Sequence, residues 1–135
     1  MKIEVSNGEI VDKYSILTIK IGVFKDTALE NVYREYHLLF EHFKQILTLP
    51  DDFDDLTELL EVTRKLFEVN ASLWQVEDEI RAKERDQIFD DEFVRLARSI
   101  YALNDERGRL KRRINELTNS ELIEEKSYTN YRKDA

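Results

Sequence analysis

Apolar residues recur along most of this chain at intervals of three and four positions, the spacing of one face of an α-helix. The pattern occupies four stretches, at residues 7–24, at 27–47, from within 51–55 to about 86, and from about 90 to 119. Only residues 1–5 alternate apolar with charged side chains, which favours an extended segment. The sequence therefore predicts an all-α fold of four helices, preceded by a short extended segment.

Residues 15–24 allow two interpretations. Leu17, Ile21 and Phe24 continue the helical spacing of the first stretch. However, apolar residues also occupy every second position here, at Ile19, Ile21 and Val23, and the positions between them are Lys20 and Gly22. Such alternation is typical of a strand. We favour the helix, and the strand remains open at this point.

Local signals mark the ends of the expected helices. Ser6 with Glu9, and Thr27 with Glu30, match the capping box, in which a hydroxyl and a carboxylate each accept a free amide at a helix start. Acidic residues at 51–55 suit the N-terminus of the third helix, and the fourth is expected near Asp90. A few residues around Gln87–Phe89 separate these two helices, which must therefore fold back as an antiparallel hairpin.

The expected hairpin is long, because a helix reaching from within residues 51–55 to about residue 86 would span about 50 Å. The first two helices are too short to cover it side by side. They must pack end to end or leave part of its apolar stripe bare. A bare stripe would be buried by a second copy of the chain, so a homodimer is expected.

Composition narrows the class of protein. Three Gly and one Pro in 135 residues provide few turns for a β-sandwich, and the chain contains no Cys. No apolar run is long enough to span a membrane, and no secretory leader is evident. We expect one domain over residues 1–135, with 120–135 as a loose C-terminal tail, in a cytoplasmic protein.

Charge is distributed unevenly around the net value of −8. Residues 51–92 carry 15 acidic and 5 basic side chains, whereas residues 93–135 carry 7 acidic and 10 basic ones. The strongest basic cluster contains Arg107, Arg109, Lys111, Arg112 and Arg113. These residues surround the fourth helix without interleaved aromatics, so we expect them to pair with the acidic third helix and expect no nucleic-acid partner.

Three polar residues, Asn70, Glu77 and Asn104, fall on the apolar stripes of the two hairpin helices. A turn near residue 88 would place Asn70 close to Asn104 and Arg107. Such a group can line a polar pocket for a ligand, or it can be a buried contact that fixes the register of the helices. The sequence favours the second interpretation and leaves the first open.

Signals of catalysis and metal binding are weak. The two histidines, His37 and His42, are five residues apart, and Glu58 with Glu61 supplies only half of a paired-acid magnesium motif. The chain has no nucleophile elbow and no glycine-rich phosphate loop. We predict no metal and no cofactor, identify no catalytic residue, and leave open whether the protein is an enzyme.

Other polar residues lie beside the stripes. Asp12, Lys13 and Lys20 flank the apolar face of the first helix, where they can form ion pairs or bind a ligand. In the last segment, Tyr128 and Tyr131 can dock onto the body of the protein or onto a partner.

Four ordered blocks resemble a small bacterial family that is catalogued only as a domain of unknown function. The blocks are GEIVDKYSILTIK (residues 8–20), LWQVEDEIR (73–81), FVRLARSIYALNDER (93–107) and SELIEEKSY (120–128). The resemblance covers nearly the whole chain, although residues 44–57 match no block. It implies a mostly helical protein without an assigned reaction, sometimes associated with glycosyltransferases and surface-polysaccharide synthesis.

Two functions follow as hypotheses. The favoured one is a non-catalytic accessory or scaffolding protein that binds another protein, such as a glycosyltransferase. Its candidate partner-binding residues are Trp74, Lys126, Tyr128 and Tyr131. The alternative is a small enzyme or binding module for an anionic sugar or nucleotide sugar in a pocket between helices. Its candidate ligand-binding residues are Asp12, Lys13, Lys20, Glu77, Asp78, Arg81, Asn104, Asp105 and Arg107.

Overall fold

The computed structural model describes residues 1–132 and confirms the all-α fold. Within these residues there are four helices and no strand: α1 (Asn7–Ile21), α2 (Asp26–Ile46), α3 (Phe53–Arg85) and α4 (Asp91–Leu117). Helix α1 continues to Ile21, so the helix is the correct interpretation of most of residues 15–24. Residues 1–6 form neither helix nor strand.

Only part of the predicted capping is present. The backbone amide of Glu9 donates to Ser6 Oγ at 3.2 Å, as expected at the start of α1. The Glu9 carboxylate contacts Lys111 instead of capping the helix. The prediction for Thr27 is wrong, because α2 already begins at Asp26 and its N-cap residue, Lys25, makes no side-chain cap.

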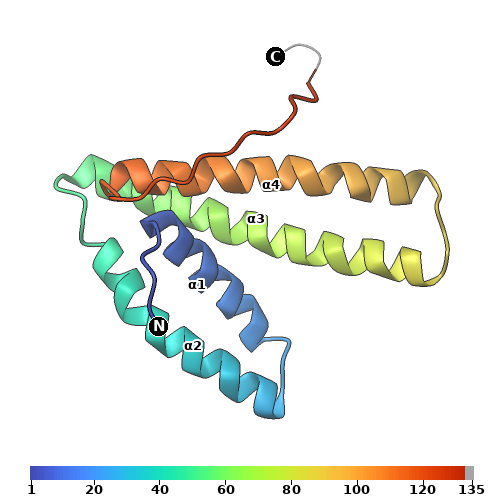
Figure 1. The fold of residues 1–135 in the computed structure, drawn as a ribbon, viewed down its shortest axis with the longest axis horizontal. Helices are drawn as coiled ribbons and strands as arrows, with labels where there is room; N and C mark the ends of the chain where they lie inside the picture. The colour runs from blue at the N-terminus through green and yellow to red at the C-terminus, as the bar shows by residue number, and fades with distance from the viewer. Residues whose placement is uncertain (133–135) are drawn as a thin grey trace.

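Helices α3 and α4 form the expected antiparallel hairpin (Figure 1). Asp52 and Asp90 cap them, and each accepts a backbone amide from the residue three positions on, at 2.8 and 2.9 Å. The connection between them contains Gln87, whose positive φ of 57° helps to reverse the chain. Both helix starts lie where the sequence predicts them.

The hydrophobic core lies at one end of the hairpin, where α1 packs across α3 and α4. It is formed by a cluster of buried side chains from all four helices: Val11, Ile46, Leu59, Val62, Leu66, Leu110, Ile114 and Leu117. Helix α2 packs mainly against α1. There the ring of Tyr14 stacks on Phe43, and its hydroxyl donates to Tyr36 at 2.7 Å.

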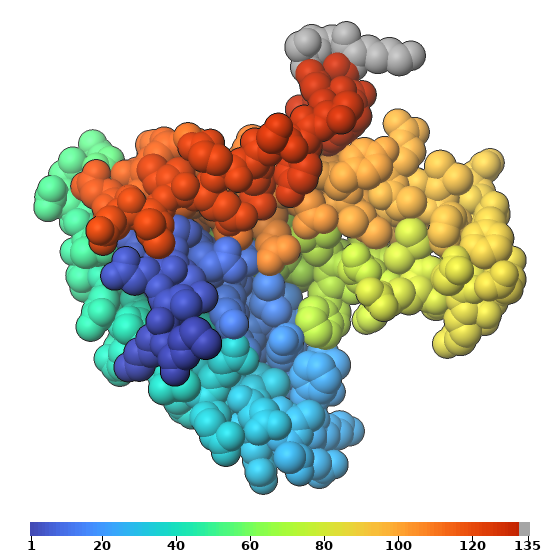
Figure 2. Space-filling model, in the orientation of Figure 1, coloured from blue at the N-terminus to red at the C-terminus, as the bar shows by residue number. Residues whose placement is uncertain are grey.

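The rest of the hairpin projects beyond α1 and α2 (Figures 1 and 2). We call residues 74–103 the arm. Leu96 is its single buried side chain, whereas Ile88, Phe89 and Val94 are about half exposed. Of the two arrangements considered for the first two helices, the structure therefore has the one that leaves part of the stripe bare.

After α4 the chain runs back along this helix without regular structure (Figure 1). We call residues 121–132 the C-terminal segment. Its residues are exposed, but Glu125 pairs with Arg112 at 3.0 Å and the ring of Tyr131 lies 4.8 Å from that of Tyr101. Residues 133–135, the end of the expected loose tail, lie outside the described residues.

Candidate ligand-binding site

Asp12 is the most deeply buried charged residue at the junction of α1, α3 and α4, with 1% of its side chain exposed. Arg107 Nε and Nη2 donate to its two carboxylate oxygens at 2.8 and 2.6 Å. Asn70 Nδ2 donates to the same carboxylate at 2.9 Å and to Ser15 Oγ at 2.6 Å. Ser15 in turn donates to the Asp12 carbonyl oxygen at 2.7 Å. The three helices therefore meet at one hydrogen-bonded polar cluster.

A glycine allows α1 to come this close to α4. A Cβ atom on Gly8 would lie 2.4 Å from the carbonyl oxygen of Lys111, so a larger residue cannot fit without displacing backbone. The amide of Gly8 donates to Asn115 Oδ1 at 2.7 Å, which joins the start of α1 to α4. One turn further along α1, the same approach brings Asp12 within reach of Arg107.

The charge state of the cluster follows from two opposing effects. Burial alone would raise the pKa of the Asp12 carboxyl. The hydrogen bonds from Arg107 and Asn70, together with the positive charges of Arg107 and Lys111, outweigh burial and hold this pKa below its ordinary value. Asp12 is therefore an anion at neutral pH and fixes the guanidinium group of Arg107 at the edge of the cluster.

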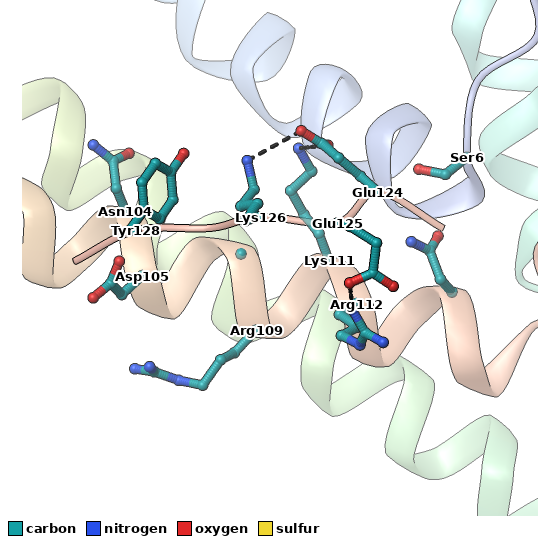
Figure 3. A pocket seen from close by; sticks show the side chains of 12 residues that line it. Ser6, Asn104, Asp105, Arg109, Lys111, Arg112, Glu124, Glu125, Lys126 and Tyr128 are labelled. Atoms are coloured by element: carbon teal, nitrogen blue, oxygen red, sulfur yellow. Dashed lines mark hydrogen bonds and ion pairs between the residues drawn. The ribbon is translucent and has the colours of Figure 1, made fainter. Parts of the chain in front are cut away.

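Lys111 extends the cluster toward the C-terminal segment. Its side chain is 12% exposed, and its Nζ lies 2.7 Å from Glu9 and 3.6 Å from Glu124. Lys126 contacts Glu124 from the other side at 3.1 Å, so two lysines share one carboxylate (Figure 3). Hydrogen bonding from Lys126 and the charge of Lys111 lower the pKa of Glu124.

A cavity of about 540 Å³ lies between α4 and the C-terminal segment. Cationic, amide, carboxylate and tyrosine side chains line it: Tyr101, Asn104, Asp105, Arg107, Lys111, Lys126, Tyr128 and Tyr131, with Gly108 and Thr129. A smaller cavity of about 260 Å³ adjoins it and shares Asn104, Lys111 and Lys126 (Figure 3). We call these two together the segment cavity.

A second cavity, of about 390 Å³, lies where the end of α1 leaves the hairpin, and we call it the notch. It is lined by Ile16, Asn70, Leu73, Trp74, Glu77, Asp78, Arg81, Asn104 and Arg107. Asn104 and Arg107 line both the notch and the segment cavity, so the two adjoin.

The structure brings most of the predicted ligand-binding residues together. Asn104, Asp105 and Arg107 line the segment cavity, with Asp12 behind Arg107. Glu77, Asp78 and Arg81 line the notch. Lys13 and Lys20 lie apart: Lys13 pairs with Glu35 of α2 at 3.0 Å, and Lys20 lies in the last turn of α1.

The predicted partner-binding residues also lie in these cavities. Lys126, Tyr128 and Tyr131 line the segment cavity, and Trp74 lines the notch. Gly8, Ser15 and Glu124 were not singled out by the sequence. They lie within the blocks at residues 8–20 and 120–128, but their roles depend on contacts between residues distant in the chain, which these blocks do not indicate.

The prediction that the basic cluster pairs with α3 is wrong for most of its members. Arg113 does contact Glu58 of α3. The other four instead reach α1, the C-terminal segment or their own helix; these four are Arg107, Arg109, Lys111 and Arg112. Because α1 and the C-terminal segment cover α4 here, they supply the nearest carboxylates.

Residues 1–132 contain neither a membrane-spanning helix nor a cluster of metal ligands. No helix in that range combines the length and apolar character that crossing a membrane requires. No group of three or more His, Cys, Asp or Glu side chains in the same range could hold a metal ion.

The similarity of this chain to known proteins lies at the level of the family. No curated protein and no solved structure matches it. Residues 1–133 match the family of unknown function DUF6165, which spans nearly the whole chain. The chain therefore belongs to the DUF6165 family.

Proposed function

We propose that this protein is a binding module for an anionic sugar or nucleotide sugar, held at the junction of α1, α3 and α4. The observation that carries the proposal is the convergence of charged and amide side chains from α3, α4 and the C-terminal segment on two adjoining cavities. A scaffold that used these residues only for register would pair them inside the seam between helices. Asp12, Asn70 and Arg107 do pair at the junction. Glu77, Asn104 and Asp105, however, line open cavities of about 390 and 540 Å³, within the range of small-ligand sites, about 300–1000 Å³.

The segment cavity suits the anionic part of the ligand. Asp12 holds Arg107 in place with two hydrogen bonds, and within residues 1–132 the other N–H donors of Arg107 have no partner. Lys111 and Lys126 share Glu124, which is half exposed on a segment without regular structure. A phosphate or carboxylate can displace Glu124 and take both lysines as partners.

Thermal unfolding tests this proposal directly. The protein is heated with nucleotide sugars, sugar phosphates, nucleotides and inorganic phosphate in turn. A ligand that binds only the folded state, at one hundred times its Kd, stabilises it by about 2.7 kcal/mol and raises Tm visibly. We expect at least one phosphate-bearing sugar to do so, and a flat response to the whole panel would refute the proposal.

Matched lysine variants locate the binding. Lys126→Gln removes a cation from the segment cavity, whereas Lys65→Gln removes an exposed cation of α3 that lies outside both cavities. We expect Lys126→Gln to reduce the shift in Tm and Lys65→Gln to leave it unchanged. Equal shifts in the two variants would place the ligand elsewhere.

A second candidate function is favoured by the arm. A non-catalytic accessory protein of the cytoplasm, for example a partner of a glycosyltransferase in surface-polysaccharide synthesis, needs an exposed apolar surface. The arm offers Ile88, Phe89 and Val94.

The same exposed apolar surface of the arm suits a homodimer. Sedimentation across a range of concentrations tests this: we expect a dimer that Val94→Glu weakens, and a monomer at all concentrations would oppose the homodimer.

A further inference from the structure

The notch differs chemically from the segment cavity. On α3, the residues that line it recur at helical spacing from position 70 to position 81, so they form one continuous face: Asn70, Leu73, Trp74, Glu77, Asp78 and Arg81. Asn104 and Arg107 stand one turn apart on α4 opposite this face. The notch thus combines an indole ring with two amides, two carboxylates and two guanidinium groups.

Several of these groups have hydrogen-bonding capacity to spare. Within residues 1–132, the side chains of Asp78 and Asn104 make no hydrogen bond or ion pair. Glu77 pairs with Arg81 at 3.1 Å, but 43% of the Glu77 side chain and 79% of the Arg81 side chain are exposed. Internal pairing therefore accounts for only part of the polar lining, and the remaining donors and acceptors can serve a bound molecule.

From this lining we infer that the notch binds a sugar ring stacked on Trp74. One face of a pyranose carries mainly C–H groups and can lie flat on an aromatic ring, while its edge carries adjacent hydroxyls. Carboxylates accept from hydroxyls, guanidinium groups donate to them, and amides do both. In the notch the two guanidinium groups are balanced by Glu77 and Asp78, so a simple phosphate is attracted less strongly there than to the cations of the segment cavity.

The inference rests on the proposed function for one point, the orientation of the whole ligand. Arg107 and Asn104 border both cavities, so a sugar in the notch can carry its phosphate into the segment cavity. The ligand class is then a hexopyranose bearing a phosphate or diphosphate, with the ring against Trp74 and the anion near Lys111 and Lys126.

Trp74 provides the readout, because it is the single Trp of the chain. Its fluorescence is followed while methyl hexopyranosides, the matching sugar 1-phosphates and inorganic phosphate are titrated in. We expect the methyl glycosides and sugar phosphates to change the emission and to saturate. Inorganic phosphate should bind without changing it.

Calorimetry on variants tests the contact itself. Trp74→Leu should weaken sugar 1-phosphate binding about tenfold, the upper range for an aromatic stacking contact, and leave inorganic phosphate binding unchanged. Phe53→Leu, at an exposed aromatic of α3 outside both cavities and outside the arm, is the matched control. Asp78→Asn is a second test of the notch, in case Trp74→Leu folds poorly. It neutralises a carboxylate that has no partner within residues 1–132, and it should weaken sugar binding.

The outcomes separate the two proposals. If Lys126→Gln weakens sugar phosphate binding but Trp74→Leu and Asp78→Asn do not, and the fluorescence stays constant, the notch inference is wrong and the proposed function stands. If methyl glycosides bind at Trp74 but no phosphate-bearing ligand gains from Lys126, the notch is confirmed and the proposed anion site fails. No binding by any ligand overturns both.

Discussion

At the scale of single residues, Asp12 shows how this protein accommodates a buried charge. An isolated carboxylate inside a helical junction would be strongly destabilising. Arg107 of α4 and Asn70 of α3 together donate to both oxygens of the Asp12 carboxylate, so this buried charge is paired and hydrogen-bonded. The same hydrogen bonds hold Arg107 beside both cavities. The cluster therefore contributes both to the stability of the fold and to the proposed binding site.

Asp12→Asn should destabilise the fold by about 3 kcal/mol, because it leaves Arg107 partly buried without its anion. Urea unfolding measures this. Glu30→Gln, at an exposed carboxylate of α2, should change the free energy of unfolding by less than about 0.5 kcal/mol. Similar values for the two variants would show that the buried pair contributes little.

The same pair predicts a pH dependence. The pKa of Asp12 is lower in the folded than in the unfolded chain, so its ionised form favours folding. This stabilisation is complete above the unfolded pKa, about 4, and is lost as the pH falls through the folded value. The difference in stability between wild type and Asp12→Asn should therefore shrink below about pH 4. A constant difference down to pH 2 would contradict this assignment.

Glu124 yields a prediction for binding. Its carboxylate contacts both Lys111 and Lys126. A ligand anion would contact the same two lysines in place of Glu124. Glu124→Gln should increase the affinity for a phosphate-bearing ligand about two- to fivefold, the equivalent of one exposed ion pair. Glu121→Gln on the same segment is the control, and calorimetry is the measurement. Weaker binding in Glu124→Gln would mean that Glu124 supports the ligand.

At the scale of the elements, two glycines on neighbouring helices have opposite roles. Gly8 lies where α1 meets the backbone of α4, and a Cβ atom there would collide with a carbonyl oxygen. Gly108 lies inside α4, and a Cβ atom there would make ordinary contacts of 3.7 and 3.8 Å with the Lys126 side chain. Close packing between helices thus requires only the first glycine.

Replacing these two glycines with Ala should therefore change the free energy of unfolding in opposite directions. Gly8→Ala should destabilise the protein by about 1–3 kcal/mol through overpacking. Gly108→Ala should stabilise it by up to about 1 kcal/mol, because Ala favours a helix interior. Denaturant unfolding of the two variants checks this. If both substitutions stabilised the protein, α1 and α4 could not be in such close contact.

At the scale of the whole molecule, stability is concentrated at one end. The core and the Asp12 cluster lie where α1 crosses the hairpin, while the arm has one buried side chain, Leu96. Regions with few buried contacts open more easily than the core. The long helices α3 and α4 are therefore each stable at one end and weakly held at the other.

Amide hydrogen exchange should show this gradient. At concentrations where sedimentation shows a monomer, amides of residues 74–103 should exchange faster than those of residues 59–70 and 107–117. At higher concentrations, protection of the arm alone would indicate that a second copy covers it. Uniform protection along α3 in the monomer would contradict the concentration of stability at the junction.

Local sequence patterns predicted the helices well, because they depend on neighbouring residues. Asp52 and Asp90 act within one turn of their own helices, and the starts of α3 and α4 follow from them. The site was predicted less completely. Asp12 and Lys13 are adjacent and looked equivalent in the sequence, but successive helical residues point in different directions: Asp12 faces the junction and Lys13 faces α2.

The sequence by itself determined the fold class, the hairpin and the polar residues on its apolar stripes, since periodicity and capping are local properties. The tertiary structure alone decided that α1 and α2 cover one end of the hairpin, that Lys111 pairs with Glu9 and Glu124, and that Asn104 and Arg107 border two cavities. These features join residues up to about a hundred positions apart. Their positions follow from the way the helices pack, which the pattern along any single helix does not specify.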